Sequence, residues 1–298
     1  MLKNVSECPI CRSTNLATHI DAPEDIELNE SSLGSSRIAV SHGRILRCKD
    51  CRFGFAVASL TEEQLTELYR KLDDKVYEAE RRGRDKTAFQ HLKIVSRYVG
   101  SGRLLDVGCA SGAFLSHCAQ AGWKVAGVEP ARGLCARART ILGGHGEVYC
   151  ATLQKAALPE SSFDVVTLWD VLEHVTDPVQ FVRLCTALLK PGGYLFANVP
   201  DLDSFQARVM GRRWPLLLPE HFNYFTRESL ELCGKKAGLN LRAFGRRPAF
   251  FSLDYFLYRL WQHEIPGSTI ARTLAKKLRA DLLLIPVHLG ETYGVWVR

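Results

Sequence analysis

Residues 104–115 read LLDVGCASGAFL. The segment begins with an apolar run, continues through a turn framed by Gly108 and Gly112, and then places apolar residues at helical spacing. This order predicts a strand, a tight turn and a helix, which together form the first unit of an open α/β sheet. Glycine adopts backbone dihedrals closed to other residues and lets a ligand approach the main chain closely. We therefore expect a ligand where the carboxyl end of the strand meets the positive end of the helix.

A second apolar run, KVAGV at 124–128, ends in Glu129. An acidic residue at the tip of the second strand can accept hydrogen bonds from two ribose hydroxyls. The first turn reads Asp106-x-Gly108-x-x-x-Gly112, whereas the nicotinamide enzymes have G-x-G-x-x-G. The loop thus offers fewer bare amides to a pyrophosphate, and the pattern favours a nucleoside without phosphates.

Four blocks in this order resemble the class I S-adenosylmethionine-dependent methyltransferases. They are LLDVGCASG at 104–112, GVEP at 127–130, SFDVVTLWDVLEHVTDP at 162–178 and LLKPGGYLFANVP at 188–200. The resemblance, which covers roughly residues 100–298, implies an α/β fold with a Rossmann-like sheet of seven strands, the last antiparallel. It also implies S-adenosylmethionine as cofactor and S-adenosylhomocysteine as product. A Rossmann-like domain without a cofactor is the alternative.

The resemblance places the cofactor contacts on the carboxyl edge of the sheet. The residues it indicates are Asp106, Gly108, Cys109, Gly112, Phe114, Glu129, Pro130, Thr152, Leu153, Trp169 and Asp170. At Thr152 and Leu153 we expect backbone contacts with adenine, because the acidic residue usual in the family is not obvious there. Ala110 departs from the family pattern, which usually has glycine, so we expect altered affinity rather than loss of binding.

Two C-x-x-C pairs lie near the start of the chain, Cys8 with Cys11 and Cys48 with Cys51. Each turn can aim two thiolates at one point, and two turns complete a tetrahedral site for a structural zinc ion. Alternating patterns around the second pair predict a small zinc-ribbon-like domain over 1–58. We expect a helical linker or lid over 59–99 and the methyltransferase domain over 100–298 to follow it. The alternatives are chance pairs or a redox pair, but neither pair opens a helix in a thioredoxin-like context.

Composition narrows the class of protein. The 298 residues are 46% hydrophobic and 24% charged, as in an ordinary globular protein. No apolar run is long enough to span a membrane and no signal region precedes Cys8, so we expect a cytoplasmic protein without a membrane partner. The net charge of +7 is spread out and no RNA-binding signature occurs, so a nucleic-acid partner is not expected. The remaining cysteines are expected to be small core residues rather than disulfides: Cys109, Cys118, Cys135, Cys150, Cys185 and Cys233.

The residues after the fifth predicted strand carry the candidate chemistry. Residues 214–225 read WPLLLPEHFNYF, an apolar and aromatic loop that encloses a histidine beside a glutamate. In some zinc-bearing relatives that act on metabolites and sugars, a Glu-His pair in this loop is the proposed base, and the resemblance maps that role onto Glu220 and His221. Tyr224 and His174 are further catalytic candidates. His221 could instead pin its loop, and His174 could support the turn after the fourth strand.

We therefore expect methyl transfer from S-adenosylmethionine to a small-molecule acceptor, at oxygen rather than carbon or nitrogen, in specialised, envelope or sugar metabolism. One alternative is an RNA or protein methyltransferase that docks its substrate on the ribbon, and another is a non-enzymatic interaction module. Against nucleobase N-methylation, the fourth strand ends in Trp-Asp-Val rather than the Asn/Asp-Pro-Pro-aromatic element. The apolar helical insertion at 248–290 could wall the acceptor pocket, form a homodimer surface or pack into the core.

Overall fold

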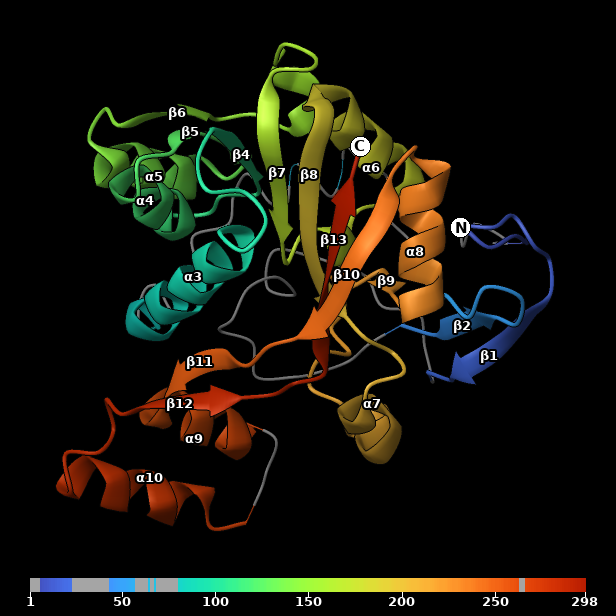
Figure 1. The fold of residues 1–298 in the computed structure, drawn as a ribbon. Helices are drawn as coiled ribbons and strands as arrows, with labels where there is room; N and C mark the ends of the chain where they lie inside the picture. Colours follow the sequence, from blue (N-terminus) through green and yellow to red (C-terminus); the bar gives the residue numbers. More distant parts are fainter. Residues whose placement is uncertain (1–5, 23–42, 57–63, 65–66, 68–79, 263–265) are drawn as a thin grey trace.

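The main sheet has seven strands in the order β10-β13-β8-β7-β4-β5-β6 (Figure 1). The computed structural model describes residues 6–22, 43–56, 64, 67, 80–262 and 266–298. Strands β4 to β8 run parallel, whereas β13 is antiparallel to both of its neighbours. This confirms the predicted α/β class and the seven-stranded sheet with an antiparallel last strand. The strands are β4 (Arg103–Val107), β5 (Lys124–Val128), β6 (Gly146–Tyr149), β7 (Phe163–Trp169), β8 (Leu189–Pro200), β10 (Asn240–Arg246) and β13 (Glu291–Val297).

Successive residues of the central strands point to opposite faces, so the sheet supports two apolar cores. Leu104 of β4 packs with one group of helices and its neighbour Leu105 with the other. The first group covers one face and the second group the other (Figure 1). The first group is α3 (Arg81–Val95), α4 (Ala113–Gln120) and α5 (Arg132–Leu142), and the second is α6 (Pro178–Leu188) and α8 (Arg227–Lys236).

The starts of α6 and α8 follow from their sequences. The Asp177 side chain accepts a hydrogen bond from the Gln180 amide, and Pro178 occupies the first turn, where no amide hydrogen is required. Thr226 and Ser229 form a capping box at the start of α8. These caps set where the chain leaves the carboxyl edge of the sheet, next to the predicted site.

The two cysteine pairs belong to a second, four-stranded sheet in the order β1-β2-β3-β9. Its first three strands come from the N-terminal segment, but β9 comes from the loop that carries the candidate base. The Phe53 and Phe225 rings meet edge to face at 5.0 Å, which adds an apolar contact across the same joint. The domain boundaries 58 and 99 stay predictions, and residues 59–63, 65–66 and 68–79 of the predicted linker or lid lie outside the described residues. The strands are β1 (Leu16–Ile20), β2 (Ile45–Cys48), β3 (Gly54–Ala56) and β9 (Asn223–Tyr224).

The insertion before the last strand differs from the purely helical expectation. Along the chain, two helices lie between the two strands of a small antiparallel sheet, and this unit projects from one end of the main sheet (Figure 1). The buried Glu80 ties it to the start of α3 by accepting hydrogen bonds from the Ser252 amide and hydroxyl. Among the described residues no helix is long and apolar enough to cross a bilayer. The elements are β11 (Ala249–Ser252), α9 (Leu253–Gln262), α10 (Ser268–Lys277) and β12 (Leu284–Val287).

The expectation that none of the cysteines outside the two pairs forms a disulfide is wrong for one pair. Cys135 of α5 and Cys150, which directly follows β6, form a disulfide with a Cα–Cα distance of 5.6 Å. The sequence places these residues in different predicted elements. Only the packing of α5 against β6 brings the two Cα atoms within the range that a disulfide spans.

Candidate functional site

The turn after β4 needs both of its framing glycines. Gly108 has φ of 77° and Gly112 has φ of 82°, in the left-handed region that favours glycine. A Cβ on Gly108 would lie 2.6 Å from Val171 Cγ2, and one on Gly112 would lie 3.1 Å from the Ala138 Cα. The second glycine therefore also lets α4 approach α5. The turn thus has the shape predicted for a close approach of ligand to backbone.

Ala110 lies between these glycines and also has a positive φ, 47°. The left-handed conformation disfavours an L-residue with a Cβ by roughly 1–2 kcal/mol. The Ala110 amide is held by a hydrogen bond to Glu129 Oε2 at 2.9 Å. The alanine therefore holds a left-handed backbone conformation that glycine would adopt without this energetic disadvantage.

Glu129 follows β5 and is buried, with 6% of its surface exposed. In addition to the Ala110 contact, its Oε1 accepts a hydrogen bond from the Ala131 amide at 2.8 Å. Burial raises the pKa of Glu129, and the two amide hydrogen bonds oppose that rise. A carboxylate oxygen can accept more than one hydrogen bond, so the side chain is fixed and can still accept from ribose hydroxyls.

Asp106 lies in β4 and is fully enclosed. Its Oδ1 accepts a hydrogen bond from the Thr167 hydroxyl of the neighbouring strand β7 at 2.6 Å. Burial raises the pKa of Asp106 to about 7, against the lowering effect of Thr167, and the negative charges of Glu129 and Asp170 add to the rise. The residue thus sits at the centre of the carboxyl edge, between the two acidic residues that the sequence also assigned to cofactor binding.

An aromatic stack borders the turn, and one member was not predicted. The Trp169 ring at the end of β7 stacks on His91 of α3 with centroids 3.8 Å apart, and Phe114 meets Trp169 edge to face at 5.6 Å. His91 is buried, which lowers its pKa well below the ordinary value, and the Arg247 guanidinium lowers it further. His91 and Trp169 each keep one ring nitrogen without a hydrogen-bond partner within the described part of the chain. No motif marks His91, since only tertiary packing brings α3 to this edge.

The other predicted cofactor residues lie along the same edge. Cys109 is buried in the turn, and its amide, like that of Gly108, donates to the Val128 carbonyl. Pro130 follows Glu129 directly. Thr152 precedes, and Leu153 begins, the short helix η2 (Leu153–Lys155) after β6. All these positions follow carboxyl ends of parallel strands, where ligands bind in open α/β sheets.

The candidate catalytic residues meet where two loops join. The His174 Nδ1 is 2.9 Å from the Glu220 carbonyl oxygen, and the His221 Nδ1 is 2.9 Å from the Leu216 carbonyl oxygen. The two imidazole rings lie edge to face with centroids 4.8 Å apart. Tyr224 is fully buried beside them, which raises its pKa, and its hydroxyl is 3.5 Å from the Leu218 carbonyl oxygen. The structure therefore brings all four predicted catalytic residues into one neighbourhood.

Two polar residues that the sequence did not indicate, Asn198 and Glu291, lie next to the predicted Asp170. Asp170 accepts a hydrogen bond from the fully buried Asn198 of β8. Glu291 lies at the start of β13, and its burial raises its pKa to about 7. The negative charge of Asp170 adds to this rise, whereas the Arg247 charge and a hydrogen bond with Asn198 oppose it. Because β13 runs antiparallel to β8, its first residue lies at the carboxyl edge of β8. The antiparallel register is the signal that could have located Glu291.

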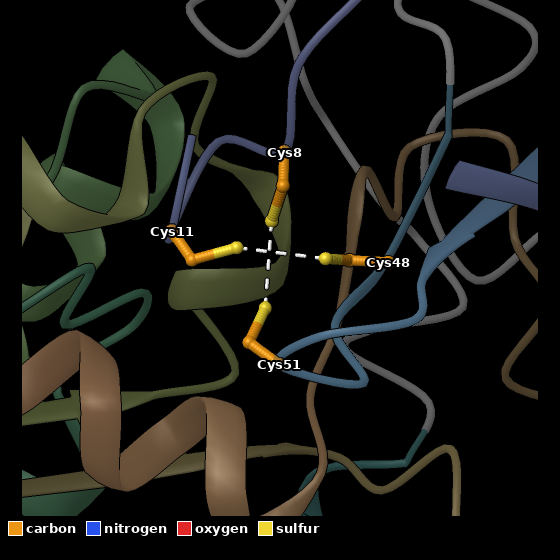
Figure 2. A group of neighbouring side chains, drawn as sticks. All are labelled: Cys8, Cys11, Cys48 and Cys51. Atoms are coloured by element: carbon orange, nitrogen blue, oxygen red, sulfur yellow. Dashed lines mark hydrogen bonds between the residues drawn. The ribbon is translucent and has the colours of Figure 1, made fainter. Parts of the chain in front are cut away.

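The four cysteines of the paired knuckles converge on one point (Figure 2). The Sγ atoms of Cys8 and Cys51 are 3.5 Å apart, as are those of Cys11 and Cys48, and all four lie within 4.8 Å of one another. A zinc ion with Zn–S bonds of about 2.3 Å separates its sulfur ligands by about 3.8 Å. The donor set and spacing therefore fit a structural zinc ion.

Comparisons with known proteins identify the family. A family model described as "Methyltransferase domain" matches residues 66–243. The curated relatives include the "Ubiquinone biosynthesis O-methyltransferase" of Bordetella avium (strain 197N), 34% identical over 46% of this chain and 61% of the relative. The same-named protein of Ralstonia nicotianae (strain ATCC BAA-1114 / GMI1000) is 40% identical over 46% of this chain and 62% of the relative. The match thus spans about three fifths of the relatives' length.

Solved structures support the fold. A SAM-dependent methyltransferase from Archaeoglobus fulgidus matches with a TM-score of 0.51 at 18% identity. The match covers 76% of this chain and 100% of the Archaeoglobus protein. One from Leishmania major matches with a TM-score of 0.51 at 15% identity, over 79% of this chain and 82% of the other. With the family model covering more than half of the chain, these findings lead to one conclusion: the protein belongs to the methyltransferase-domain family, within the class I S-adenosylmethionine-dependent methyltransferases.

Proposed function

We propose that this protein transfers a methyl group from S-adenosylmethionine to a hydroxyl of a small-molecule acceptor. The observation that carries the proposal is the Glu129 carboxylate, which two backbone amides hold at the tip of β5 beside the glycine-framed turn. The names of the curated relatives, O-methyltransferases at 34% and 40% identity, favour oxygen as the methylated atom. Specialised, envelope or sugar metabolism remains the proposed setting.

In this proposal the carboxyl edge of the sheet binds the cofactor. Glu129 accepts hydrogen bonds from the ribose hydroxyls, the turn with Gly108 and Gly112 brings bare backbone close to the ligand, and Trp169 supplies an apolar wall. When bound, S-adenosylmethionine supplies an electrophilic methyl group. The remaining predicted cofactor residues are proposed to contribute contacts along the same edge: Asp106, Cys109, Phe114, Pro130, Thr152, Leu153 and Asp170.

The Glu220–His221 pair is the proposed proton acceptor for the acceptor hydroxyl. A carbonyl oxygen can only accept, so the Leu216 carbonyl requires the proton of a neutral His221 to be on Nδ1. The Nε2 atom then carries a basic lone pair, and one member of the Glu220–His221 pair takes the hydroxyl proton as the oxygen attacks the methyl carbon. His174, anchored in the same way to the Glu220 carbonyl, and the buried Tyr224 are proposed to position this loop.

The ribbon-like sheet is proposed to position the same loop from the other side. Its strand β3 pairs with β9, which begins two residues after His221. A zinc ion at the four cysteines would therefore stabilise the strand that follows the candidate base. This role is structural, because four cysteine ligands leave no position for water or substrate. The division into segments 1–58, 59–99 and 100–298 is retained as part of the proposal.

Isotope labelling tests the proposed reaction. The protein is incubated with S-adenosylmethionine carrying a labelled methyl group and a fractionated extract of its source cells. We expect label in the small-molecule fraction, and NMR of the labelled methyl carbon should show a methoxy group. Label in RNA or protein, or a methyl group on carbon or nitrogen, would contradict the proposal.

Variants of the base pair test the assignment of roles. His221→Gln and Glu220→Gln should lower kcat while S-adenosylmethionine binding stays unchanged. The matched control His145→Gln alters an exposed histidine after α5 and should leave kcat unchanged. If neither base-pair variant changes the pH dependence of kcat, the pair is not the proton acceptor.

A further inference from the structure

Three side chains beside the proposed base offer a ligand set for a second metal ion. Each of Glu173, His174 and His221 provides one ligand atom, and these atoms lie within 4.8 Å of one another. Ligand atoms on one zinc or manganese ion lie about 3–4.2 Å apart, so small side-chain rotations would bring the three into coordination. Two imidazoles with one carboxylate form a set that leaves open positions on the ion.

The two histidines are oriented as metal ligands usually are. Both Nδ1 atoms are 2.9 Å from backbone carbonyl oxygens, of Glu220 for His174 and of Leu216 for His221. Since a carbonyl cannot donate, each Nδ1 carries the proton of the neutral ring, and the metal-binding lone pair is on Nε2. A ligating histidine typically donates its other ring proton in this way, which fixes both tautomer and ring orientation.

Glu173 supplies an independent indication. Only 2% of the residue is exposed, and its Oε2 has no hydrogen-bond partner among the residues that the structure describes. A buried carboxylate oxygen without a donor is destabilising unless a proton or cation meets it. Glu173 was not assigned a role in the sequence, and the proposed methyl transfer does not use it.

Backbone contacts hold the three ligands together. The Phe222 amide donates to the Glu173 carbonyl at 2.7 Å. The Asn223 side-chain amide donates to the carbonyls of Leu172 at 2.9 Å and Val175 at 2.6 Å. The turn with Glu173 and His174 is thereby joined to the loop with His221, as a preorganised metal site requires.

We infer that Glu173, His174 and His221 bind a divalent cation, such as manganese or zinc, with open positions for an acceptor oxygen. The inference rests on the proposed function for its chemistry and deepens it. An acceptor hydroxyl bound to the cation loses its proton more readily. The proton passes to the Glu220 carboxylate, the oxygen forms a bond to the methyl carbon as the carbon–sulfur bond breaks, and the sulfonium becomes a neutral sulfide. Within the Glu220–His221 pair proposed above as the proton acceptor, the cation thus assigns the proton to the Glu220 carboxylate and takes the His221 Nε2 atom as a ligand.

Manganese(II) distinguishes this site from the four cysteines, because thiolates prefer softer ions. Protein that holds one equivalent of zinc, the amount that the four cysteines take, is titrated with manganese(II), and free manganese is measured by electron paramagnetic resonance. We expect one additional equivalent to bind and nitrogen couplings from imidazole to appear in the bound spectrum. Absence of manganese uptake by the unaltered protein would overturn the inference.

Variants identify the ligands. Glu173→Gln and His174→Gln should each weaken manganese binding by at least about 100-fold, whereas the exposed controls Glu160→Gln and His145→Gln should not. Thermal unfolding and S-adenosylmethionine binding report whether each variant is folded. Binding that is unchanged in both folded ligand variants would place the ion elsewhere and overturn the assignment.

The two proposals can fail separately. Methyl transfer by protein that binds no manganese would leave the proposed function standing and remove the cation site. Manganese binding that depends on Glu173, in protein that transfers no methyl group, would do the reverse.

Discussion

Glu129 Oε2 accepts a hydrogen bond of 2.9 Å from the backbone amide of Ala110, which joins the tip of the second parallel strand to the turn after the first. The same carboxylate that is proposed to bind ribose therefore also holds the turn in its left-handed conformation. The geometry of the loop and the proposed ligand recognition thus involve one side chain. A substitution at Glu129 or at Ala110 should therefore alter the structure around the other residue.

Replacement of Glu129 tests the cofactor site. Glu129→Ala removes the charged acceptor of the proposed ribose hydrogen bonds, and a hydrogen bond to a charged group is worth about 1.5–3 kcal/mol. We expect the Kd for S-adenosylmethionine, measured by titration calorimetry, to rise roughly 10- to 150-fold. Glu129→Gln keeps one acceptor oxygen and should have a smaller effect. An unchanged Kd in Glu129→Ala would remove Glu129 from the site, and the exposed Glu160→Gln serves as control.

Replacement of Ala110 tests the strain in the turn. Glycine at this position removes a left-handed penalty of roughly 1–2 kcal/mol but adds chain entropy to the unfolded state. We expect Ala110→Gly to raise the free energy of unfolding by up to about 1 kcal/mol in urea titrations. Ala119→Gly in the last turn of α4, where the backbone is helical, should instead lower it, by up to about 1 kcal/mol. A loss of stability in both variants would show that Ala110 is not strained.

Replacement of one cysteine tests the structural zinc. Cys48→Ser removes one of four ligands, so the bound zinc, measured by elemental analysis, should fall from about one equivalent toward zero. Because β9 belongs to the same sheet, methyl transfer should decline more than cofactor affinity. Cys185→Ala, at a buried thiol of α6 outside the cluster, should keep its zinc. Unaltered protein with well below one equivalent would argue against the site.

The pH dependence of stability tests the buried Asp106. Burial raises its pKa from 3.8 to about 7, so between these values the folded protein holds a proton that the unfolded chain has released. Stability conferred by that proton declines as pH rises through this window, by on the order of a few kcal/mol. We expect unfolding free energies at about pH 5 and about pH 7.5 to differ less in Asp106→Asn than in the unaltered protein.

Asp164, a carboxylate whose pKa is lowered rather than raised, provides the control for that measurement. Despite some burial, the Arg103 amide and the Lys190 ammonium lower the pKa of Asp164. Its stabilising effect is present above the ordinary pKa of 3.8 and is lost as pH falls below it. Asp164→Asn should therefore lose stability at neutral pH. Equal pH profiles for Asp106→Asn and the unaltered protein would contradict a raised pKa at Asp106.

Local sequence was sufficient for the parallel part of the fold. The apolar runs, the glycines at 108 and 112 and the caps at Asp177 and Thr226 each act through residues close in the chain, so their structural consequences can be read without tertiary contacts. The antiparallel last strand and the family came from the resemblance of four ordered blocks. The four cysteines were also identifiable, because the C-x-x-C spacing itself brings two thiolates together.

Contacts between distant segments were decided by the tertiary structure alone. His91 reaches Trp169 because α3 packs across the sheet, Glu291 reaches Asn198 because β13 runs antiparallel, and Cys135 reaches Cys150 because α5 covers β6. No local pattern encodes these distances, since each depends on how two elements pack.

The proposed base could be identified from local sequence, whereas the proposed cation site depends on tertiary contacts. The sequence indicated Glu220 and His221 as neighbours in one loop, whereas Glu173 and His174 lie in another. Hydrogen bonds of the Phe222 amide and the Asn223 side chain join the two loops. Residue types and short spacings thus follow from the chain itself, but a ligand set drawn from two loops exists only after the backbone groups of both loops have paired.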